Sequence, residues 1–161
     1  MKKQVLAILI AWLLFIGVDF LFHASLFASL WKENVAAFKS LDDLMILIPA
    51  GYLSFLLLTA LIGYLFFRIF TIKPTLKEVL KFGTIFGILF SLSNFFGLFS
   101  YVAIPLEHLL LFNLVYFIEI MVVTLCLFFI SFSDRLKKAV SISILIFFIL
   151  FFSGMIIQNI L

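Results

Sequence analysis

Five long apolar segments, separated by short polar stretches, make up most of the chain. Each is long enough to cross the roughly 30 Å hydrocarbon core of a bilayer as an α-helix. Apolar runs of this length with few charges are typical of transmembrane helices. The pattern predicts an all-α polytopic bundle of five membrane helices, forming a single domain over residues 1–161. The predicted helices cover residues 5–30, 44–70, 79–104, 106–132 and 138–160.

Composition supports this pattern and excludes a soluble domain. The 161 residues are 66% hydrophobic and 12% charged, and the mean hydropathy is +1.38. A soluble domain carries roughly twice this charged fraction. The net charge of +3 does not indicate a nucleic-acid partner, because the lysines lie at the ends of the predicted helices. The lipid bilayer is therefore the expected surrounding, and no nucleic acid is expected to bind.

The distribution of lysine and arginine predicts the orientation in the membrane. Only Lys32 and Lys39 fall on one side of the predicted helices. The other nine lie on the opposite side: Lys2, Lys3, Arg68, Lys73, Lys77, Lys81, Arg135, Lys137 and Lys138. An excess of Lys and Arg marks the cytoplasmic side. The bias places the N-terminus in the cytoplasm and the C-terminus outside, in what we expect to be a bacterial inner (plasma) membrane.

Ionisable residues interrupt the first and fourth predicted helices. Asp19 and His23 are one helical turn apart, so their side chains lie on one face of the first helix. At about 1.5 Å per residue, Asp19 and Glu119 both fall near the middle of the bilayer. A second polar layer is expected nearer the outer surface, with Tyr116 between the two layers. This second layer holds His23, Asn94 and Asn113.

The two carboxylates admit more than one protonation state. An isolated charge at a helix centre costs roughly 2.5–3.5 kcal/mol on the insertion scale, so these groups must face protein or water. Asp19 and Glu119 at close range would not both ionise, and one would hold a proton and donate it to the other. Alternatively, His23 and Asp19 would form an imidazolium–carboxylate pair. The sequence does not choose between these arrangements.

Small residues on the third predicted helix indicate close helix packing. Gly83, Gly87 and Ser91 recur every four residues, a spacing that lets a neighbouring backbone approach closely. Ser93 and Gly97 form a second stripe a little further around the helix. Two such stripes predict that the third helix packs against neighbouring helices on two sides and lies at the centre of the bundle. The first and fourth helices are then expected to face one another.

The chain contains none of the familiar motifs for catalysis or cofactor binding, such as HExxH, GxSxG, a P-loop or a dinucleotide fingerprint. Haem would need His23 and His108 as axial ligands, yet His108 falls at the interface, well above His23. Asp19, His23 and Glu119 are acceptable metal ligands but lack a second histidine. We therefore expect no cofactor and no metal, and an enzyme is the least favoured class.

Several short motifs resemble those of small bacterial inner-membrane proteins of unknown function. They are the Asp-x-x-x-His of the first helix, the Trp31 that follows it, and the KFGxxxG that opens the third helix at Lys81. The resemblance covers about the first two-thirds of the chain. It implies no particular activity.

Two functional classes remain. The first is a multi-pass inner-membrane protein whose buried protonatable site, formed by Asp19, His23 and Glu119, serves transport or binding of a small ligand, a cation or a proton. The alternative is a structural or assembly subunit of a membrane complex, whose polar groups only hold helices together. A homodimer or another membrane subunit is the expected partner in either case.

Overall fold

The computed structural model describes residues 2–32, 39 and 41–160, and within these ranges it is entirely helical apart from turns and connections. Five helical segments are long and apolar enough to cross a membrane. This confirms the predicted all-α fold with five candidate membrane spans. In chain order, the elements are α1 (Lys2–Leu21), a π-helical turn η1 (Phe22–Leu26), α2 (Ala28–Lys32), α3 (Leu41–Ile69), α4 (Leu76–Tyr101), α5 (Leu106–Ser131) and α6 (Leu136–Ile160).

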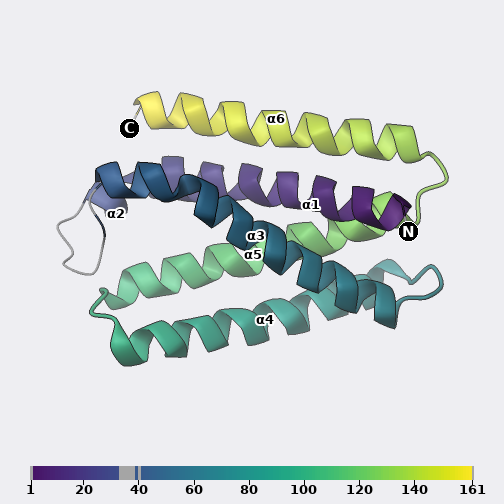
Figure 1. The fold of residues 1–161 in the computed structure, drawn as a ribbon, viewed down its shortest axis with the longest axis horizontal. Helices are drawn as coiled ribbons and strands as arrows, with labels where there is room; N and C mark the ends of the chain where they lie inside the picture. Colours follow the sequence, from purple (N-terminus) through teal and green to yellow (C-terminus); the bar gives the residue numbers. More distant parts are fainter. Residues whose placement is uncertain (1, 33–38, 40, 161) are drawn as a thin grey trace.

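The helices lie side by side, and the ends marked N and C are at opposite ends of the bundle (Figure 1). Helices α1 and α5 form the centre. α1 packs against α3, α5 and α6, while α5 packs against α1, α4, α3 and α6. Half of the residues in the most apolar stretch of α5 are buried, compared with 11% of the residues in the most apolar stretch of α6. The prediction that the first and fourth spans face one another is therefore confirmed by the pairing of α1 with α5.

The predicted central position of the third span is wrong. This span is α4, which lies at one side of the bundle and packs extensively on α5 alone within the described chain (Figure 1). Its first small-residue stripe makes that contact, because a Cβ atom at Gly87 would lie only 2.9 Å from the Phe117 ring. The second stripe makes no such contact. Ser93 is exposed, and no atom lies within 4 Å of a Cβ atom added at Gly97.

The start of α4 is fixed by a capping box at the boundary between loop and membrane. The Glu78 backbone N–H donates to Thr75 Oγ1 at 3.3 Å, and the Thr75 N–H donates to Glu78 Oε2 at 2.7 Å. These bonds satisfy two backbone donors that the first turn of a helix leaves open. The cap therefore lets α4 begin among polar groups and continue into the apolar layer.

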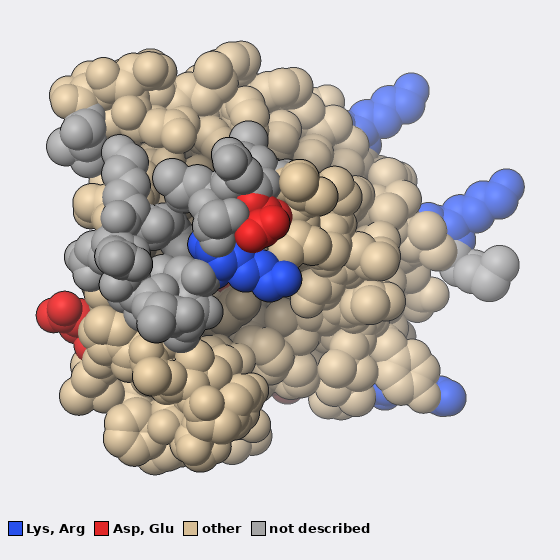
Figure 2. Space-filling view, turned by 60° about the vertical axis from the view of Figure 1, so that its left-hand side comes forward, with Lys and Arg blue, Asp and Glu red and all other residues tan. Residues whose placement is uncertain are grey.

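The outer surface of the bundle is apolar along its sides. Side chains such as Leu57 of α3, Leu89 of α4 and Ile156 of α6 are more than 60% exposed. Figure 2 shows Lys and Arg side chains projecting from one end of the molecule, with a broad surface of other residues beside them. Such a surface is stable in lipid and not in water, since monomeric soluble proteins rarely expose large apolar patches. The chain is an integral membrane protein.

Candidate functional site

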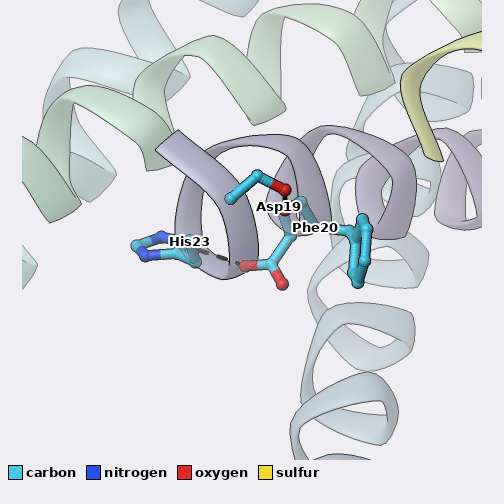
Figure 3. Close-up of polar contacts among 4 residues, drawn as sticks. Asp19, Phe20 and His23 are labelled. Atoms are coloured by element: carbon cyan, nitrogen blue, oxygen red, sulfur yellow. Dashed lines mark hydrogen bonds and ion pairs between the residues drawn. The ribbon is translucent and has the colours of Figure 1, made fainter. Parts of the chain in front are cut away.

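Three ionisable side chains from the two central helices meet inside the bundle. Asp19 and His23 come from the end of α1 and from η1, and Glu119 comes from the middle of α5. One ligand atom from each of the three lies within 4.8 Å of the others. His23 Nε2 is 3.9 Å from Asp19 Oδ1, and Figure 3 shows both side chains on the same side of the helix. The predicted meeting of Asp19 with Glu119 is thus present in the structure.

The local backbone between Asp19 and the end of the first span is not a regular α-helix. A π-helical turn covers Phe22–Leu26, and the Phe27 N–H donates to the Phe22 carbonyl five residues earlier, at 2.8 Å. The Ser25 hydroxyl donates to the Phe20 carbonyl at 3.1 Å. A side-chain donor of this kind supplies part of the bonding that the irregular turn needs. Single π turns inside helices are frequent at functional sites, and this one carries His23.

The π turn is held in place by α6. Ser25 is buried, and a Cβ atom at Gly154 would lie 2.8 Å from both Ser25 Oγ and the Phe20 ring. Glycine at position 154 therefore allows α6 to approach the back of the turn closely. The position of His23 thus depends on packing on the opposite side of α1.

Glu119 is the most deeply placed member of the site. Its side chain is fully buried, and neither carboxylate oxygen has a hydrogen-bond partner among the described residues. It lies thirteen residues after Leu106, the first residue of α5, and twelve before Ser131, the last, which is about 20 Å and 18 Å along the axis. A buried carboxyl group of this kind is costly unless its charge is compensated. Within the cluster, His23 can supply a compensating positive charge when it is protonated, whereas Asp19 is a second acid.

Tyr116 stands beside this site. Its phenol group is close enough to interact electrostatically with both Glu119 and Asp19. Its ring packs edge-on against Phe90 of α4 at 5.6 Å, and it lines a cavity of about 310 Å³ with residues of α3 and α4. Tyr116 therefore lies between the acidic pair and the space enclosed by α3, α4 and α5.

Asn94 and Asn113 form a separate contact between α4 and α5. The Asn94 side-chain amide donates to Asn113 Oδ1 at 3.0 Å, and the Asn113 amide donates to the Leu109 carbonyl at 2.7 Å. The first of these bonds joins α4 to α5, whereas the second lies within α5 and uses a backbone carbonyl one turn earlier. Their predicted shared depth is consistent with this pairing. Their role in the structure is helix packing, and the contacts found for them do not include Asp19 or Glu119.

His108, which the sequence places near the membrane interface, has a side chain that is fully buried within the protein. Its ring centre is 6.1 Å from that of Phe112, which in turn is 5.2 Å from His23. The signal in the sequence is the separation of eleven residues from Glu119. Three helical turns span 10.8 residues, so both side chains lie on the face of α5 that turns toward α1. The buried polar face of α5 therefore runs from His108 to Glu119.

The fold and this arrangement define a class: a multi-pass membrane protein with a polar site between its two central helices, in which Glu119 is buried and Asp19 and His23 are partly exposed. Comparison with protein-family models, with curated proteins and with solved structures finds no match to the chain.

Proposed function

We propose that the protein binds a divalent metal ion within the membrane, in exchange for protons, and that this binding serves transport or sensing of the cation. The observation that carries the proposal is the convergence of Asp19, His23 and Glu119 within 4.8 Å inside the bundle. The proposal departs from the interpretation of the sequence, which disfavoured a metal because only one histidine is available. The fully buried Glu119 carboxylate, directed into the same cluster, supports a bound cation.

The dimensions of the cluster suit a metal after a small adjustment. Three ligand atoms at most 4.8 Å apart can all lie about 2.8 Å from a central point, and metal–nitrogen and metal–oxygen bonds measure about 2.0–2.2 Å. Side-chain movements of less than about 1 Å would close that difference. Imidazole together with carboxylate is a ligand combination that suits ions such as Zn²⁺, Mn²⁺ and Fe²⁺.

Charge balance supports exchange with protons. Two ionised carboxylates, Asp19 and Glu119, carry two negative charges, which a divalent ion neutralises with a neutral His23 as third ligand. Without the ion, protons must compensate the carboxylates, because two like charges at short range in a medium of low dielectric constant repel strongly. Metal binding should therefore release protons, and metal affinity should rise as the pH rises.

Proteoliposomes give the test of this function. With the full chain reconstituted and a metal-sensitive dye inside, we expect an inward Mn²⁺ or Zn²⁺ gradient to produce metal entry and proton movement in the opposite direction. Glu107→Gln, which changes an exposed acid on the same helix, should behave like the unaltered protein. Metal binding without flux would indicate sensing. Proton flux in the absence of metal, with no metal entry, would indicate that the site binds protons only.

The competing class, a structural or assembly subunit, has its own support. The Asn94–Asn113 hydrogen bond and the close approach at Gly87 join helices without any ligand. If neither metal nor protons bind or cross, and the protein is lost from cells only when a second membrane protein is deleted, this class is correct.

The orientation proposed is N-terminus in the cytoplasm and C-terminus outside, in a bacterial inner membrane. It is supported by the excess of Lys and Arg at one end of the bundle. Alkaline phosphatase, which is active only outside the cytoplasm, should be active when fused after α6 and inactive when fused after α5. The reverse pattern would overturn the orientation. A homodimer or another membrane subunit remains the proposed partner, to be tested by crosslinking in membranes.

A further inference from the structure

A groove separate from the acidic site opens on the side of the bundle between α5 and α6. These two helices each pack against α1 but contact one another little. The space left between them has a volume of about 930 Å³ and reaches inward to Leu14 of α1. Its size is within the range of small-molecule binding sites, roughly 300–1,000 Å³. We call this space the α5–α6 groove.

The walls of the α5–α6 groove are almost entirely apolar. They are formed by side chains such as Val122 and Phe129 of α5 and Ile142 and Ile146 of α6. From Val122 of α5 to Phe132, the residue that caps its C-terminus, the groove follows ten residue steps, about 15 Å along the helix axis. This length equals about half of the roughly 30 Å hydrocarbon core, which is the depth of one leaflet. The groove therefore has the length and chemistry that suit an acyl chain.

The mouth of the groove is basic. Lys73 from the α3–α4 connection, and Arg135 and Lys138 from the start of α6, line it together with one acid, Asp134. All four side chains are exposed, so they are free to meet a ligand at the membrane surface. Lys3 Nζ donates to the Ser133 carbonyl at 3.0 Å, which brings a fourth cation to the same place. Three cations against one acid give the lining a net charge of +2.

We infer that the α5–α6 groove holds one phospholipid with an anionic headgroup. The apolar walls would contact an acyl chain in one leaflet, and Lys73, Arg135 and Lys138 would bind the phosphate. Basic pockets between transmembrane helices bind anionic headgroups in this way. A zwitterionic lipid would fill the apolar part equally well, so the basic mouth is what selects an anionic one. This inference is independent of the metal site and of the proposed function.

Mass spectrometry of intact protein–lipid complexes tests the inference. The full chain in mild detergent is mixed with phosphatidylglycerol or with phosphatidylcholine carrying the same acyl chains. We expect the first phosphatidylglycerol to bind severalfold more tightly than phosphatidylcholine. Each basic residue near a membrane surface contributes about fivefold, so Arg135→Gln with Lys138→Gln should remove most of this preference.

The matched control removes two positive charges from outside the α5–α6 groove. Lys77→Gln with Lys81→Gln changes two exposed lysines of α4 that do not line the groove, and it should keep the preference. Ile142→Trp fills the groove from a half-exposed position and should weaken binding of both lipids. Equal binding of the two lipids by the unaltered protein, or an equal loss in the control, would overturn the inference. So would displacement of phosphatidylglycerol by millimolar inorganic phosphate, because a phosphate site alone would then explain the binding.

Discussion

Glu119→Gln is expected to weaken binding of Mn²⁺ or Zn²⁺ by about 100-fold or more while the protein still folds. Glutamine keeps the size and most of the hydrogen-bonding capacity of the side chain but removes one negative charge. The site would then hold a divalent ion with a single carboxylate, and an uncompensated charge in a medium of low dielectric constant is costly. Changes to groups that only support metal ligands already cost about 10–100-fold, so a lost ligand should cost at least as much. Competition with a metal-chelating dye, using the full chain in detergent, measures the affinity.

Asp19→Asn should show the same loss, because it provides the second carboxylate, whereas Glu107→Gln should bind metal normally. The thermal stability of the two variants distinguishes a metal site from a purely structural role for the acids. A buried acid that only holds helices together would, when changed, lower the midpoint of thermal unfolding without altering metal affinity. An unchanged affinity in both Glu119→Gln and Asp19→Asn would contradict the proposed site.

Gly87→Leu is expected to disrupt the contact between α4 and α5. A Cβ atom at this position already falls 2.9 Å from Phe117 Cδ2 and 3.6 Å from Ile120 Cγ2, so a larger side chain must push α4 away from α5. Overpacking of this kind costs about 1–3 kcal/mol. Among the described helices, α4 packs extensively only on α5, and its contacts with α3 are few, such as the Phe82 ring 5.7 Å from that of Phe66. The free energy of unfolding, measured in mixed detergent micelles, should be lower for this variant than for the unaltered protein.

Gly97→Leu provides the matched control on the same helix. A Cβ atom there has no neighbour within 4 Å, and leucine has a higher helix propensity than glycine. Its stability should equal or exceed that of the unaltered protein. If Gly97→Leu were as destabilising as Gly87→Leu, the one-sided packing of α4 would be wrong.

The relative position of the ionisable residues along the bundle could be predicted from the sequence. Apolar runs of the right length fix where each helix enters the bilayer, and the rise of about 1.5 Å per residue then places Asp19 and Glu119 at similar depth. The four-residue spacing of Asp19 and His23 gives a common face. These two rules were enough to predict that the three groups could meet. They also placed Asn94 and Asn113 at the same depth.

The lateral order of the helices could not be predicted in the same way. The small residues Gly83 and Gly87 show that α4 has a close neighbour, but not how many neighbours it has. Ser93 and Gly97 have the same spacing and face no described helix, because small residues permit a contact without requiring one. The π turn at Phe22–Leu26 depends on packing against Gly154, more than a hundred residues away. The eleven-residue separation of His108 from Glu119 places both on one face of α5, but which helix covers that face at His108 does not follow from the spacing.

Anomalous X-ray scattering from crystals grown with Mn²⁺ or Zn²⁺ would show directly whether a metal ion binds between α1 and α5. We expect one strong anomalous peak inside the bundle, within about 2.0–2.3 Å of carboxylate oxygens of Asp19 and Glu119 and of a His23 ring nitrogen. Crystals of Glu119→Gln grown in the same way should lack it. A map without density at this position, or with metal only on exposed residues at the ends of the helices, would contradict the account.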